Sequence, residues 1–159
     1  MAPPQTLGSQ PIPPFYRLWF TIVDPIVCLG TSFMCFWDPD LGLTSVVPVD
    51  IATRNPYQDF LFHQTGGLYL MLAIHLAVLL RYTSDLGVWK INQAAVLVVD
   101  FILLWSQYYS QRQQGRLALD AWRQEDYAAA AITIFVAVLR TCFLLNVGFE
   151  PGKTHEKAN

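Results

Sequence analysis

The segment from Phe60 to Tyr82, FLFHQTGGLYLMLAIHLAVLLRY, decides the fold of this chain. Its only Asp, Glu, Lys or Arg residue is Arg81, at its very end. The segment matches the roughly 20 apolar residues that a helix needs to cross a bilayer core. Its apolar residues do not alternate with polar ones, as they would in a strand, and a helix satisfies its own backbone hydrogen bonds in lipid. We therefore expect a membrane-spanning helix here.

Three further segments have the same character. We predict spans at about 15–36, 88–109 and 127–149, beside the one at 60–82. Trp and Tyr residues lie near the span ends, as expected for an aromatic belt at the membrane interface. Between the spans, 37–59 reads as a polar loop outside the membrane, TSDLG as a tight turn, and 110–126 as a polar connector. The sequence thus predicts an all-α, integral membrane four-helix bundle with both termini on one side.

The ends of the chain differ from this four-span domain at 15–149. Residues 1–14 are rich in proline and lack an apolar periodicity, so we expect a disordered tail. They carry no basic region or small-residue cleavage site of a signal peptide. Residues 150–159 are expected to form a second disordered, solvated tail. Basic residues are too evenly divided between the two sides to predict the orientation in the membrane.

The composition supports the membrane assignment and excludes several functions. Of the 159 residues, 53% are hydrophobic and only 14% are charged, whereas about a quarter of a soluble domain is charged. The net charge of -2 argues against a nucleic-acid partner. Cys28, Cys35 and Cys142 form no CxxC pair, so neither a disulfide framework nor a zinc site is indicated. No motif points to a metal, flavin, haem or nucleotide, and we expect no cofactor.

Three ionisable residues lie inside the predicted spans, namely Asp24, Asp100 and Arg140. Inserting such a residue into a membrane near the centre of a helix costs roughly 2.5–3.5 kcal/mol of free energy. Counted from the side of the termini, all three fall within about 8 Å of one another in depth. Arg140 could hold one carboxylate as a base while the other carboxyl stays protonated as an acid, which suits acid–base chemistry without a cofactor. The alternative is a structural ion pair that fixes the helix register.

Other polar residues recur at helical spacing, which predicts stripes that face the bundle interior. The predicted stripes are Gln64, Gly67, Met71 and His75 in the second span, and Asn92, Val96, Asp100 and Gln107 in the third. His75 reads either as a hydrogen-bonded core histidine or as a catalytic one. Trp122, in the last connector, could close over a ligand or anchor the chain at the interface. Pro25 follows Asp24 and lacks an N–H, so we expect it to free a helical carbonyl.

Four segments in this order and spacing carry a resemblance to a known family: PFYRLWFTIVDPIVCLG, FHQTGGLYLMLAIHLAVLLRYTSD, VLVVDFILLWSQYYS and ITIFVAVLRTCFLLNVGF. Over about residues 14–149 the chain resembles a fungal family of small four-span membrane proteins, many of which are described only as a domain of unknown function. The motifs fall on Asp24-Pro25, Gly67-Leu68-Tyr69, Asp100 and Arg140-Thr141. Some members are described as epoxide hydrolases or cyclases of aurovertin-, citreoviridin- and asteltoxin-type polyketide biosynthesis.

The resemblance implies an enzyme that opens apolar, polyene-derived epoxides with water or an internal hydroxyl. Asp24 and Asp100 would then be acid and base, in either order, and Arg140 would organise them. Four polar residues would then position the substrate or water: Gln64, Tyr69, His75 and Asn92. Trp122 is a further candidate contact. We expect the endoplasmic reticulum membrane as location, with the lipid bilayer, a second copy of the chain or pathway enzymes as partners. The alternatives are a cofactor-free cyclase or isomerase of terpenoid or polyketide chains, and a non-enzymatic membrane scaffold.

Overall fold

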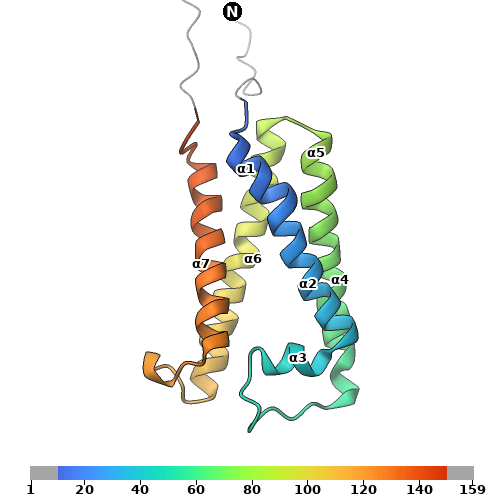
Figure 1. Cartoon of the computed structure of the whole chain (residues 1–159), viewed down its shortest axis with the longest axis vertical. Helices are drawn as coiled ribbons and strands as arrows, with labels where there is room; N and C mark the ends of the chain where they lie inside the picture. The colour runs from blue at the N-terminus through green and yellow to red at the C-terminus, as the bar shows by residue number, and fades with distance from the viewer. Residues whose placement is uncertain (1–10, 150–159) are drawn as a thin grey trace, which may run out of the picture.

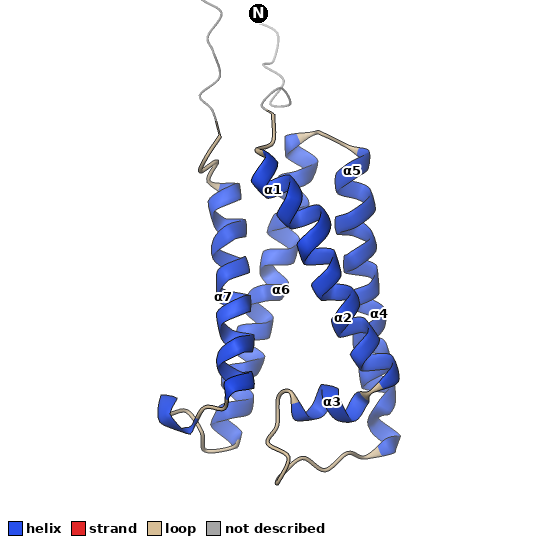
Figure 2. Ribbon diagram, in the orientation of Figure 1, coloured by secondary structure: helices blue, strands red, loops and turns tan. Residues whose placement is uncertain are grey.

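The computed structural model describes residues 11–149, and the predicted tails at 1–10 and 150–159 lie outside the described residues. Within residues 11–149 the structure has four long helices. They run side by side, as Figures 1 and 2 show. The first comprises α1 (Pro14–Leu18), a π-helical turn η1 (Trp19–Val23) and α2 (Asp24–Trp37). The second comprises η2 (Pro56–Gln58), α4 (Asp59–Ile74), the π-helical turn η3 (His75–Leu79) and α5 (Leu80–Tyr82). The third is α6 (Leu86–Gln113) and the fourth is α7 (Gln124–Leu144).

All four helices are long and apolar enough to cross a membrane. The described residues contain no strand, so the predicted all-α four-helix bundle is confirmed. Large apolar side chains cover the outside of the bundle, among them Phe33, Ile91 and Phe101, each more than half exposed. Such a surface is compatible with lipid and unfavourable in water. The protein therefore has the architecture of an integral membrane protein.

The ends of the first and last helices differ from the prediction. Ile12, placed in the predicted N-terminal tail, is buried in the core, and the first helix begins at Pro14. Proline is well suited to a first helical turn because its missing N–H would have no partner there. The last helix ends at Leu144 rather than near residue 149. Positive φ angles at Asn146 (59°) and Gly148 (79°) turn the chain out of the helix.

The helices pack as two hairpins. The first helix packs along α4, and α6 packs along α7. Gly66 lies at the contact of the first pair, where the Ser32 hydroxyl donates a hydrogen bond to the Gly66 carbonyl oxygen at 2.9 Å. A Cβ atom at Gly66 would lie 3.0 Å from the Cβ of Cys35 and from the Phe36 ring, so any larger residue here would have to displace these neighbours.

The two hairpins meet at the end of the molecule that carries the termini. Aromatic rings from three helices form this contact, with Phe143 of α7 lying 5.1 Å from Tyr16 and 5.5 Å from Phe20, measured between ring centroids. Trp89 of α6 is also fully buried there. The Tyr16 hydroxyl donates a hydrogen bond to the Val147 carbonyl at 2.9 Å. Toward the opposite end the hairpins separate, as Figure 1 shows.

The expected loop at 37–59 contains an additional short helix, α3 (Pro39–Thr44), which lies across the separated end of the bundle (Figure 1). Asp38 caps α3 by accepting a hydrogen bond from the Leu41 N–H, and Pro39 occupies the first helical position. Both residues are typical of a helix start. The rest of the loop is held by Arg54, which forms ion pairs with Asp40 and Asp59.

Candidate functional site

The three charged residues predicted to meet do form one buried cluster where the two hairpins converge. Arg140 of α7 donates from Nε to Asp100 Oδ2 of α6 at 2.8 Å. It also donates from Nη1 to Asp24 Oδ2, at the start of α2, at 2.7 Å. The side chains of all three are less than a tenth exposed. One arginine therefore holds two carboxylates from two other helices.

Gln93 completes this cluster and was missed by the sequence reasoning. It lies two turns before Asp100 on α6, is fully buried, and accepts a hydrogen bond from Arg140 Nη1 at 3.1 Å. Its amide nitrogen Nε2 is buried and has no partner among residues 11–149. A signal was available in the sequence, because the buried residues Leu86, Trp89, Gln93, Val96 and Asp100 follow helical three- and four-residue spacing.

The cluster keeps chemical capacity after its internal bonds are made. Each aspartate uses one oxygen for Arg140, and its other oxygen accepts no hydrogen bond from the described residues. Likewise, Arg140 Nη2 donates no hydrogen bond within residues 11–149, and the Phe20 ring lies 5.6 Å from the Arg140 Cζ. Two carboxyl groups opposite one guanidinium leave one negative charge unbalanced if both are ionised, so a proton on one carboxyl would neutralise the cluster.

Two local features of the first helix place Asp24 in the cluster. The π-helical turn η1 ends immediately before Asp24, and such turns are frequent at functional sites. Pro25 has no N–H to offer the preceding turn, and the Thr21 carbonyl instead accepts a hydrogen bond from Arg81 at 2.9 Å. Arg81 of α5 thus supplies a donor to the carbonyl one turn before Pro25. The two π-helical turns, η1 and η3, also pack against each other.

A cleft of about 430 Å³ opens between the separated ends of the hairpins and stops near the cluster. Its inner end includes Tyr69 of α4 and Leu103 of α6. Leu103 lies one helical turn from Asp100 and on the same face. The cleft thus approaches the cluster from the side of the connectors.

A second groove, of about 350 Å³, approaches the cluster from the outer surface of the bundle. It runs between the first helix and α7, and Asp24 is the one charged residue in its lining. The other lining residues are apolar: Trp19, Val23, Val27, Ala131, Ile132, Phe135 and Val136. An apolar molecule in the bilayer would therefore have a continuous apolar surface leading to Asp24.

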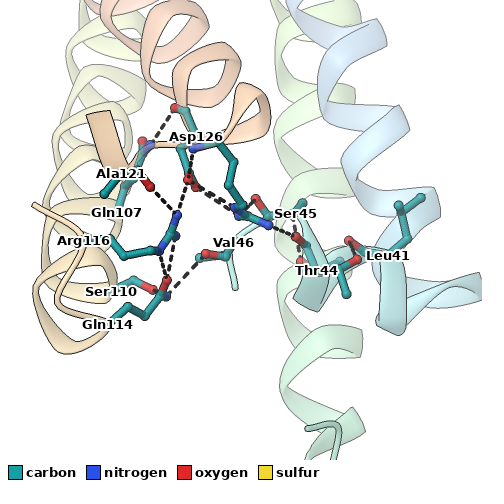
Figure 3. Close-up of polar contacts among 12 residues, drawn as sticks. Leu41, Thr44, Ser45, Val46, Gln107, Ser110, Gln114, Arg116, Ala121 and Asp126 are labelled. Carbon is teal, nitrogen blue, oxygen red and sulfur yellow. Dashed lines mark hydrogen bonds and ion pairs between the residues drawn. The ribbon is translucent and has the colours of Figure 1, made fainter. Parts of the chain in front are cut away.

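An ion-pair network fastens α3 over the outer end of the cleft (Figure 3). Asp126, at the start of α7, is buried and accepts hydrogen bonds from Arg116 at 2.8 Å and Arg123 at 3.0 Å. Arg123 also donates to the carbonyls of Thr44 at 2.9 Å and Ser45 at 3.4 Å, directly after α3. The hydrogen bond to Asp126 raises the pKa of Arg123 above its ordinary value. This connector therefore caps the bundle at the outer end of the cleft.

The remaining predicted site residues are placed differently. Tyr69 is half-buried and lines the cleft, and Asn92 lies next to Gln93 with a buried amide nitrogen that has no partner in the described chain. Trp122 is half-buried beside Tyr127, at 5.2 Å between ring centroids, and is not part of the cleft lining. Gln64 and His75 are exposed and are not brought to the cluster; His75 Nδ1 contacts the Met71 carbonyl at 2.9 Å.

The predicted inward stripe of the second span is therefore wrong. Gln64, Gly67, Met71 and His75 all lie on the exposed face of the helix. The face that packs inward carries Gly66, Ala73, Leu76 and Leu80. Gly66, rather than Gly67, makes the close contact with the first helix. The helix is therefore turned so that the predicted polar stripe faces away from the bundle interior.

Comparison with known proteins adds a family but no activity. No curated protein and no solved structure matches the chain. One family model matches residues 9–150, which include the whole bundle and every residue of the buried cluster. The chain belongs to the family described as domain of unknown function DUF7704.

Proposed function

We propose that this protein is a membrane-embedded, cofactor-independent enzyme that opens apolar epoxides by acid–base catalysis at Asp24 and Asp100. The observation that carries the proposal is the shared arginine: Arg140 binds one oxygen of each carboxylate and leaves the other oxygen of each without a partner in residues 11–149. The resemblance to fungal epoxide hydrolases and cyclases of polyketide pathways also supports it. Such pathways favour the endoplasmic reticulum membrane as the location.

The proposed reaction uses the two carboxyl groups in opposite protonation states. The protonated carboxyl donates its proton to the epoxide oxygen while the bond from that oxygen to one ring carbon breaks. Water attacks that carbon, and the carboxylate accepts the proton that the water loses. The product is a vicinal diol, and the two carboxyls have exchanged their protonation states, so one proton passes between them before the next turnover. When an internal hydroxyl replaces water, the product is a cyclic ether.

Arg140 has a positioning and electrostatic role in this scheme. Its two bonds keep both carboxylates oriented, and its positive charge stabilises the ionised one. The Nη2 donor that has no partner in the described chain is available to the oxygen on which negative charge develops. The two openings suit an apolar substrate, since the outer groove reaches Asp24 from the bilayer and the cleft ends one turn from Asp100.

The test is an assay of the protein in microsomes with a polyene bis-epoxide in heavy-oxygen water. Conversion with incorporation of the label indicates hydrolysis, and conversion without label indicates cyclisation or isomerisation by the same groups. We expect Asp24→Asn and Asp100→Asn to lose turnover while still folding. Asp120→Asn is the matched control, because Asp120 is exposed in the connector before α7. Near wild-type rates in both cluster variants, or no conversion by the wild type across several epoxides, would contradict the proposal.

A scaffold role is the second candidate, and one observation favours it. The cluster joins α2 of one hairpin to α6 and α7 of the other, so its ion pairs also hold the bundle together. A scaffold for pathway enzymes would need this link for stability alone. In that case Asp100→Asn would lower stability, and the wild type would convert no epoxide.

A further inference from the structure

The cleft between the hairpins has two chemically different ends. Its inner end is lined by Thr31, Tyr69, Leu103 and Thr133, and both threonine hydroxyls there donate to carbonyls of their own helices. Its outer end, beneath α3, carries Gln111 and Asp126 beside Leu61 and Phe62. Its volume of about 430 Å³ lies within the range of small-molecule sites, roughly 300–1,000 Å³. This division suits a molecule with an apolar body and a polar end.

Gln111 is the residue that indicates a ligand. It is only 3% exposed and lines the cleft, yet its amide nitrogen has no hydrogen-bond partner in residues 11–149. Its polar neighbours are already engaged: Gln107 donates to the Asp126 carbonyl at 2.8 Å, and Gln114 donates to the Ser110 hydroxyl at 2.8 Å. A buried donor without a partner is unfavourable, and a ligand oxygen in the cleft would remove that cost.

We propose that the cleft binds an elongated, uncharged and mainly apolar molecule whose carbonyl or similar acceptor oxygen accepts a hydrogen bond from Gln111. The ligand is uncharged because the charged groups at this end already pair with one another: Asp126 accepts from both Arg116 and Arg123. The donor that is left without a partner in residues 11–149, the Gln111 amide, is neutral. This inference rests on the proposed function, since it defines the substrate class of that site.

The geometry also fixes the length of the molecule. Gln111 and Asp100 are eleven residues apart on α6, close to three full turns, so they lie on the same face. At 1.5 Å per residue the separation along the helix is about 16 Å. An extended backbone covers about 3.5 Å for every three bonds, so roughly fourteen bonds separate the acceptor oxygen from the reacting group. Shorter chains bound at Gln111 would not reach the cluster.

The test is photo-crosslinking of the full chain in lipid nanodiscs. The probe is a fourteen-carbon methyl ketone with a diazirine at its far end, and the competitors are the unmodified ketone and the fourteen-carbon alkane. We expect labelled peptides from the cleft walls. The ketone should compete at least about fivefold better than the alkane, as expected for one hydrogen bond. Gln111→Leu should remove the advantage of the ketone without weakening competition by the alkane. Gln113→Leu changes a residue on the exposed face of the same helix, and it should leave the advantage of the ketone intact.

Equal competition by ketone and alkane in the wild type, or labelling confined to the lipid-facing surface, would overturn the inference without any variant. The experiment measures binding and does not require turnover. It can therefore be repeated with Asp100→Asn, which we expect to be inactive. Selectivity that depends on Gln111 in a protein that opens no epoxide would keep this inference and remove the proposed function. Epoxide opening by a protein that binds ketone and alkane equally would keep the proposed function and remove this inference.

Discussion

Gln93 accepts a hydrogen bond from Arg140 at 3.1 Å, and it is fully buried on α6, two turns before Asp100. A hydrogen bond to a charged group contributes about 1.5–3 kcal/mol. We therefore expect Gln93→Leu to lower the free energy of unfolding by an amount of that order, measured by denaturant titration in mild detergent.

Asn92 provides the matched control for Gln93. Its amide nitrogen is buried without a partner in the described chain, so Asn92→Leu removes no bond made by that atom. We expect this variant to be as stable as the wild type or slightly more stable. A larger loss in Asn92→Leu than in Gln93→Leu would contradict the assigned contact.

Removing Arg140 should be far more harmful than removing all three charges of the cluster. Arg140→Met leaves two buried carboxylates without their cation, which should cost about 3–5 kcal/mol of unfolding free energy. The triple variant, which adds Asp24→Asn and Asp100→Asn to Arg140→Met, leaves no charge in the cluster, and it should recover most of that stability. Both variants should lack epoxide-opening activity. Recovery of activity together with stability would contradict the proposed role of the aspartates.

The sequence predicted the cluster from the depths of its three charged residues in their spans. Asp24, Asp100 and Arg140 are expensive in lipid, and their distances from the membrane surface already placed them at one level. Whether Asn92 or Gln93 reaches Arg140 depends on the rotation of α6 about its axis. The pattern of polar residues predicted that rotation wrongly by one residue. The periodicity of Leu86, Trp89 and Val96 would have selected Gln93.

Other features could not be predicted from periodicity. The adjacent pair Gly66 and Gly67 leaves the contact face of α4 undecided, and only the packing against Cys35 and Phe36 selects Gly66. The cleft arises because the hairpins converge at one end and separate at the other, which no single segment encodes. By contrast, α3 had a local signal in Asp38-Pro39, which was outweighed by the polar, proline-rich composition of the loop.

Gly66→Ala and Gly67→Ala should have opposite effects on stability. A Cβ at Gly66 would meet Cys35 and Phe36 at 3.0 Å, and overpacking of this kind costs about 1–3 kcal/mol. A Cβ at Gly67 meets nothing within 4 Å, and alanine favours a helix over glycine by about 0.5–1 kcal/mol. Thermal unfolding in detergent compares the two variants. Equal melting temperatures would contradict the helix contact at Gly66.

Arg123 should control how firmly α3 covers the cleft, because its guanidinium joins Asp126 of α7 to the carbonyls of Thr44 and Ser45. Arg123→Met should therefore increase hydrogen exchange in α3, while Arg112→Met, which changes an exposed residue of α6, should leave it unchanged. Since the hydrogen bond to Asp126 raises the pKa of Arg123, the contribution of Arg123 persists wherever the free side chain is charged and is lost as the pH rises to strongly alkaline values. Protection of α3 that falls between mildly acidic and mildly alkaline pH would show that another group holds it.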